Sequence, residues 1–132
     1  MPNPYKAHAW PRETYSLAMA VQNLLLAYKQ SIDTLDWMSP ETKKEAQAKL
    51  AKFTPKIGYP DKWRDFSGLT IDRSKSYLEN ALAATAFENA YQMAKIGKPA
   101  DREEWGMTPQ TVNAYYNPLK NEIVFPAAIL QP

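Results

Sequence analysis

The chain has 132 residues, which is enough for one modest domain and too few for two ordinary ones. Hydrophobic residues make up 45% and charged residues 23% of the sequence, a balance typical of a soluble globular protein and one that excludes wholesale disorder. The net charge is only +2 and the basic residues are scattered, so we expect no nucleic-acid partner. No cysteine is present, which excludes disulfides and cysteine–zinc sites. No window approaches the roughly 20 apolar residues of a membrane segment.

Residues 1–13 predict an irregular arm, because Pro2, Pro4 and Pro11 interrupt regular structure there. The single histidine of the chain, His8, lies in this arm. A zinc site needs three or four converging ligands and usually more than one His or Cys. We therefore interpret His8 as exposed or adventitious, and we expect no metal site and no catalytic residue in this chain.

Residues 14–110 predict a region made mainly of helices. The first helix is expected at about residues 14–37, because apolar side chains recur there at steps of three and four. Its predicted buried stripe consists of Leu17, Val21, Leu24, Tyr28, Ile32 and Leu35. Ser39, Pro40 and Glu41 predict the start of a second helix, with Ser as N-cap, Pro at the first helical position and an acid in the first turn.

A short strand and an ordered loop are expected next, in a segment dense in Gly, Pro and aromatic residues. The predicted anchors of the loop are Tyr59, Trp63 and Phe66. A third helix is expected at about residues 74–96, where Gly97 would adopt a left-handed cap. Its predicted stripe is Tyr77, Ala81, Ala84, Phe87, Tyr91 and Ala94, widened by Leu78 and Leu82.

Residues 111–132 predict a β-hairpin. Two β-prone runs, T-V-N-A-Y-Y and E-I-V-F-P, flank the turn-prone N-P-L-K-N. In a strand spanning residues 111–117, Val112, Ala114 and Tyr116 would share one face, and Asn113, Tyr115 and Asn117 would share the other.

Asparagine is depleted in strands, so the amides on this face need an explanation. For Asn117, beside the turn, we favour hydrogen bonds to nearby backbone. Asn113 precedes the turn, and its amide offers both a donor and an acceptor, the groups that hold a peptide backbone. An edge strand also binds peptides through its own N–H and C=O groups.

Several motifs of the chain resemble the neprilysin-type zinc metallopeptidases. N-A-Y-Y followed by N-E-I-V-F-P-A-A-I-L-Q-P is similar to the stretch that lies just upstream of the zinc-binding helix in that family. Upstream, L-D-W-M-S-P-E-T-K-K-E-A, K-I-G-Y-P-D-K-W and E-W match in the same order. The resemblance runs from about Tyr28 to Pro132, and residues before about Ser16 show none.

The resemblance implies a mainly α fold with a small β part, forming a partial domain of a larger two-lobed protease. Asn113 would hold the substrate backbone on the primed side of the scissile bond, Ala114 would offer its carbonyl, and Tyr115 would complete the motif. Ile123, Val124 and Phe125 would be core residues of the partner strand.

The family's catalytic motif is H-E-x-x-H, with zinc as the cofactor of the parent enzyme. That motif is absent from the sequence. We therefore expect a fragment of a zinc endopeptidase that is inactive alone, with peptide substrates and the rest of the parent protease as partners. The parent is expected to be extracytoplasmic or membrane-associated, and apolar surface left exposed predicts self-association or marginal stability.

Two further hypotheses about the function of the chain stay open. A stand-alone helical peptide-binding or protein-interaction module would bind peptides through the hairpin without any other segment. A purely structural helical domain would instead bury Asn113 and satisfy its amide internally.

Overall fold

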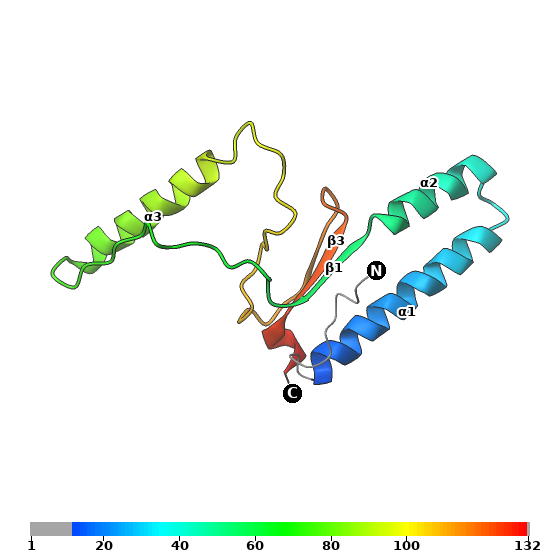
Figure 1. Cartoon of the computed structure of the whole chain (residues 1–132), viewed down its shortest axis with the longest axis horizontal. Coiled ribbons are helices and arrows are strands. Elements are labelled where there is room, and N and C mark those ends of the chain that lie inside the picture. The colour runs from blue at the N-terminus through cyan, green and yellow to red at the C-terminus, as the bar shows by residue number, and fades with distance from the viewer. Residues whose placement is uncertain (1–11, 132) are drawn as a thin grey trace. The chain divides into compact units, whose positions relative to one another are not determined.

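The computed structural model describes residues 12–131, so the predicted arm with His8 lies largely outside the described residues. The elements in chain order are α1 (Arg12–Thr34), α2 (Pro40–Ala51), β1 (Thr54–Gly58), α3 (Tyr77–Met93), β2 (Tyr115–Asn117), β3 (Glu122–Pro126) and the 3₁₀ helix η1 (Ala127–Leu130) (Figure 1). The expected mainly α fold with a small β part is confirmed. The described residues divide into two compact units, one of residues 12–60 with 105–131 and one of residues 61–104. Between residues 12 and 131, no helix is both long and apolar enough to cross a bilayer.

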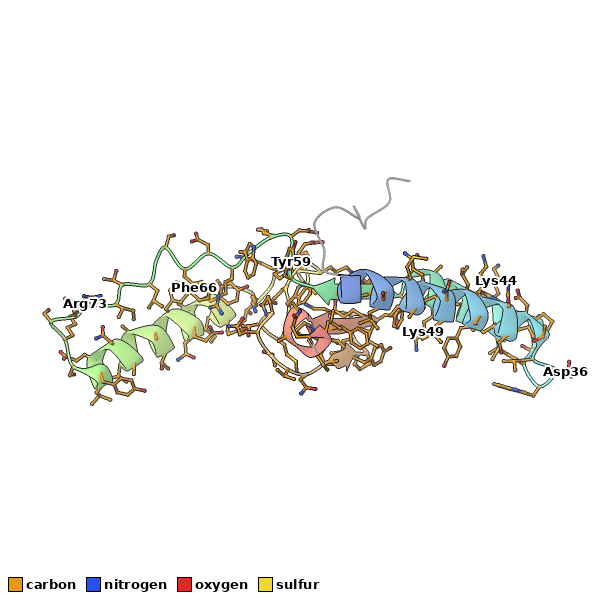
Figure 2. The ribbon with its side chains drawn as sticks, turned by 90° about the horizontal axis from the view of Figure 1, so that it is seen from below. Asp36, Lys44, Lys49, Tyr59, Phe66 and Arg73 are labelled. Atoms are coloured by element: carbon orange, nitrogen blue, oxygen red, sulfur yellow. The ribbon has the colours of Figure 1, made fainter. Side chains whose placement is uncertain are left out.

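In the first unit, α1 and α2 lie side by side as a helical hairpin, with Asp36 at its tip (Figures 1 and 2). The second helix starts as predicted, because the Ser39 hydroxyl accepts a hydrogen bond from the Thr42 N–H at 3.2 Å. The first helix ends three residues earlier than predicted, at Thr34. The chain needs residues 35–39 to reverse direction and to place Ser39 at the cap.

Polar contacts hold the two helices together near that tip. The Gln47 amide donates to the Lys29 carbonyl at 2.7 Å and to the Asp33 carboxylate at 2.8 Å. The Lys43 ammonium donates to the Asp33 carbonyl at 2.8 Å. These bonds also occupy carbonyl groups near the C-terminal end of α1.

A three-stranded sheet completes the first unit, with the strand order β1-β3-β2. The predicted hairpin is confirmed, since β2 pairs antiparallel with β3. The predicted short strand is β1, and it pairs parallel with the other side of β3. Strand β3 is therefore central, and it joins two segments that are far apart in the sequence.

The core of the first unit lies between α1 and the sheet. Ala18, Val21 and Ile57 are buried, and four partly buried residues pack around them: Leu17, Leu25, Phe125 and Leu130. The predicted stripe on α1 was partly wrong, because the side chains of Leu24 and Tyr28 are 59% and 62% exposed. The helix buries the face of Ala18, Val21 and Leu25 instead, at the same spacing of three and four.

In the second unit, α3 begins one turn later than predicted and is closed by a capping box. The Glu79 N–H donates to the Ser76 hydroxyl, and the Ser76 N–H and hydroxyl donate back to the Glu79 carboxylate at 2.8 and 2.7 Å. The bond from the Ser76 hydroxyl, with that from its N–H, holds the pKa of the Glu79 carboxyl below its usual value. Gly97 has φ +74°, the left-handed conformation that the sequence predicted.

The covered face of α3 packs around one arginine. The Arg64 guanidinium lies 3.9 Å from the ring centre of Tyr91, 5.0 Å from that of Phe66 and 5.5 Å from that of Phe87. Phe66 thus anchors the loop against α3, as predicted (Figure 2). Tyr77 is 88% exposed, and Leu78 and Leu82 are exposed too. The prediction that these three residues belong to the buried stripe of α3 was therefore wrong.

Candidate functional site

The hairpin that follows Asn113 and Ala114 is organised by Asn117. Its side-chain oxygen accepts hydrogen bonds from the backbone N–H groups of Leu119 and Lys120, at 3.1 and 3.3 Å. The predicted turn-forming role of Asn117 is therefore confirmed. Across the hairpin, Tyr115 of β2 pairs with Val124 of β3, and Asn117 pairs with Glu122.

Asn113 and Ala114 lie just before this hairpin rather than within a strand. The strand predicted at residues 111–117 is confirmed only from Tyr115 onward. Local hydrogen bonds compete with strand pairing upstream: the Thr111 N–H donates to the Thr108 carbonyl, and the Asn113 N–H donates to the Thr111 carbonyl, each at 3.0 Å. The predicted alternation of faces therefore does not extend to Asn113.

Asn113 is exposed, and its amide is oriented by its own neighbour. The side-chain oxygen accepts a hydrogen bond from the Ala114 N–H at 2.8 Å. The amide nitrogen Nδ2 has no partner among residues 12–131. The hypothesis of a purely structural domain required a buried and internally satisfied amide, and the exposed Asn113 does not meet that requirement.

Tyr115, the third predicted site residue, is tied to a preceding loop. Its hydroxyl oxygen accepts a hydrogen bond from the Gly106 N–H at 2.7 Å. Tyr115 is half-buried, whereas the next residue, Tyr116, is exposed and stacks on Phe53 with ring centres 6.1 Å apart. The sequence included Gly106 beside the matched E-W, but nothing in it indicated this bond.

A buried ion pair lies on the same face of the sheet as Tyr115. The Lys56 ammonium of β1 lies 2.8 Å from the Glu122 carboxylate of β3, with side chains 9% and 2% exposed. Sequence reasoning missed this pair. Alternation of side chains along β3 predicts that Glu122 lies on the same face as Val124. Because β3 is the central strand, this position indicates a buried carboxylate that needs a positive partner.

No group of three or more His, Cys, Asp or Glu side chains in the described part of the chain is placed to hold a metal ion. A separate apolar groove of about 660 Å³ lies between α1 and α2. It is lined by Gln22, Leu25, Leu26, Lys29, Gln47, Ala48, Leu50 and Ala51.

The chain is similar in sequence and in backbone structure to known proteins of one family. Residues 6–60 match peptidase family M13. Human endothelin-converting enzyme 1 is 41% identical over 112 residues, which cover 80% of this chain and 14% of that protein. The crystal structure of Mycobacterium tuberculosis zinc metalloprotease Zmp1 in complex with an inhibitor is 53% identical with a TM-score of 0.79, covering 97% of this chain and 19% of that one. PepO from Lactobacillus rhamnosis is 34% identical with a TM-score of 0.85, covering 97% and 21%.

The similarity is wider than the motifs suggested, because it begins at residue 6 rather than near Tyr28. The chain itself spans between 14% and 21% of the length of these three proteins. Sequence identity and backbone similarity agree over nearly the whole chain. The chain belongs to peptidase family M13, the neprilysin-type metallopeptidases.

Proposed function

We propose that this chain forms part of the substrate-binding rim of a zinc-dependent endopeptidase. The observation that carries the proposal is the position of Asn113, which is exposed, and Ala114, which is half-buried, directly before β2. It occurs in a chain that is 53% identical to the zinc metalloprotease Zmp1 over 97% of its length. We assign residues 111–132 to the rim and residues 14–110 to the helical region.

The rim offers groups that complement an extended peptide. The Asn113 amide oxygen is held by the Ala114 N–H, so Nδ2 is the group directed to an outside acceptor such as a substrate carbonyl. The Ala114 carbonyl is the acceptor that we assign to a substrate N–H. Tyr115 completes the motif, and β2 lies at one edge of the sheet, where peptides add as strands.

We assign the zinc ion to segments outside this chain, because the H-E-x-x-H motif of the family is absent from its sequence. In zinc peptidases the bound metal polarises the scissile carbonyl and activates water. The role of the residues described here is to bind and orient the peptide. From the family resemblance we also infer that the parent enzyme is extracytoplasmic or membrane-associated.

The test places this chain in a complete enzyme. In Zmp1, the segment that matches this chain is replaced by residues 1–132, and peptide cleavage is measured with and without a chelator. We expect chelator-sensitive cleavage. Asn113→Ala should lower kcat/KM by about two- to tenfold, since one neutral hydrogen bond contributes roughly 0.5–1.5 kcal/mol.

Two variants make this test specific. Asn113→Asp keeps the acceptor for the Ala114 N–H but removes the Nδ2 donor, so it should lose as much activity as Asn113→Ala. Asn89→Ala makes the same truncation at an exposed position of α3 and should change nothing. A folded, zinc-loaded hybrid without activity, or one indifferent to Asn113→Ala, would contradict the proposal. Tight peptide binding by the 132-residue chain alone, lost on Asn113→Ala, would favour a stand-alone binding module.

A further inference from the structure

We propose that Tyr115 and Gly106 form an anchor that positions Asn113 and Ala114 for substrate binding. This inference rests on the proposed rim function and adds a role for two residues within it. In this role Tyr115 is a positioning residue, since its hydroxyl oxygen accepts a hydrogen bond from the backbone of Gly106.

The contact between the two residues is close and directional. The Gly106 N–H donates to the Tyr115 hydroxyl oxygen at 2.7 Å. A Cβ added at Gly106 would lie 3.3 Å from that oxygen and 3.4 Å from the ring carbon that bears it. The shorter distance is tighter than most Cβ contacts, so a side chain at position 106 would require the phenol to shift by a few tenths of an ångström.

Both ends of the anchor are fixed to the rest of the first unit. Tyr115 is the first residue of β2, and it pairs with Val124, which is 0% exposed. On the other side, the loop that contains Gly106 is held where the Pro109 carbonyl accepts a hydrogen bond from the Ala128 N–H at 2.9 Å. The Tyr115 hydroxyl therefore joins the edge of the sheet to a loop that is itself bonded to η1.

Asn113 and Ala114 depend on this anchor because their own hydrogen bonds within residues 12–131 are local. The Asn113 N–H bonds to Thr111, two residues away, and the Ala114 N–H bonds to the Asn113 side chain. Such short-range bonds set the local turn but do not fix it relative to the sheet. Tyr115 is the adjacent residue that supplies that connection, so a shift of its ring moves the donor and acceptor of the rim.

The first experiment uses the 132-residue chain and two matched substitutions. Tyr115→Phe removes the acceptor for Gly106, whereas Tyr116→Phe makes the same change one residue along the strand. We expect Tyr115→Phe to speed hydrogen exchange of the Gly106 amide by about two- to tenfold. The NMR order parameters of Asn113 and Ala114 should fall from about 0.85 toward 0.6. Tyr116→Phe should leave both measurements unchanged, because its ring still stacks on Phe53.

The second experiment measures KM and kcat separately in the hybrid enzyme. Tyr115→Phe and Gly106→Ala should each raise KM by about two- to tenfold and change kcat by less than about twofold. The double variant should be no worse than Gly106→Ala alone, because removing the hydroxyl relieves the contact made by the new methyl group. Tyr116→Phe should behave as the unsubstituted hybrid.

The two experiments separate failure of the anchor from failure of the proposed function. Unchanged Gly106 exchange in Tyr115→Phe would show that the anchor is absent. Faster exchange with unchanged order parameters and KM would show a purely structural bond and overturn the positioning role, even while Asn113→Ala still weakens cleavage. An effect of Tyr115→Phe without any effect of Asn113→Ala would instead contradict the rim function.

Discussion

At the scale of single residues, the Lys56–Glu122 ion pair places two charged side chains in the interior of the first unit. Thr54 pairs with Glu122 and Lys56 pairs with Val124, so the two charges lie diagonally on one face of the parallel strands. Glu122 is only 1% exposed as a whole residue. Removing charges from water is costly, and the pair is tolerated because each charge compensates the other. We therefore expect the pair to specify the register of β1 against β3 more than it adds to net stability.

We predict that Lys56→Met lowers the free energy of unfolding by about 3–5 kcal/mol, because it leaves the Glu122 carboxylate buried without its cation. The double variant Lys56→Met/Glu122→Leu should recover most of the loss, since apolar side chains often replace a buried pair at little cost. Urea unfolding followed by circular dichroism measures both values. Lys44→Met, on the exposed side of α2, is the control and should stay within about 0.5 kcal/mol. Equal losses in the single and double variants would contradict a compensated pair.

At the scale of elements, α3 is stabilised differently from α1. None of residues 61–104 is buried, so this unit lacks the apolar core that α1 shares with the sheet. The Arg64 guanidinium lies over three aromatic rings instead, and it pairs with the Glu88 carboxylate at 2.7 Å. Tyr91 extends the cluster by donating to the Glu104 carboxylate at 3.1 Å. Burial, helped by this bond to the acid, raises the pKa of the Tyr91 hydroxyl.

We predict that Arg64→Ala selectively weakens the second unit. A desolvated cation–π contact contributes about 2 kcal/mol, so amide exchange along α3 should speed by roughly tenfold or more while exchange in the sheet stays unchanged. Hydrogen exchange resolved by residue measures both. Arg73→Ala removes an exposed arginine from the same unit and should have no such effect. Equal acceleration in both variants would mean that the guanidinium stack is unimportant.

At the scale of the whole molecule, the described residues expose much apolar surface. Leu24, Leu26 and Tyr28 are 58–62% exposed. Leu24 and Tyr28 lie one turn apart on one side of α1, and Leu26 lies on the opposite side. A helix that is apolar on several sides is typical of one enclosed by neighbouring elements. The groove between α1 and α2, which includes Leu25 and Leu26, is part of this surface. Exposed apolar patches of this kind favour association with other protein surfaces.

We predict that the isolated chain self-associates, and that Leu26→Glu reduces this association. Analytical ultracentrifugation over a range of concentrations gives the dissociation constant, which should rise at least about tenfold in the variant. Gln30→Glu adds the same charge to an exposed position of α1 without removing an apolar side chain, so it should have a smaller effect. A chain that stays monomeric at high concentration, or equal effects of both variants, would contradict this prediction.

The sequence by itself determined the local structure, because caps and turns depend on neighbouring residues. Ser39 and Pro40 marked the start of α2, Gly97 marked the left-handed conformation after α3, and Asn117 marked the hairpin turn. It also identified the family and Asn113 as an unusual polar residue. The extent of the strand could not be predicted, because local hydrogen bonds of Thr111 and Asn113 take the place of strand pairing before Tyr115.

Only the tertiary structure decided which faces are buried and which distant residues meet. It paired β1 with β3, and so brought Lys56 next to Glu122, which lies 66 positions further along the sequence. It selected Ala18 and Leu25 over Leu24 and Tyr28 on a helix whose composition allowed either face. It also bonded Tyr115 to Gly106. The physical reason is that a side chain's apolar or polar character shows what it can contact, whereas the partner depends on how the whole chain folds back on itself.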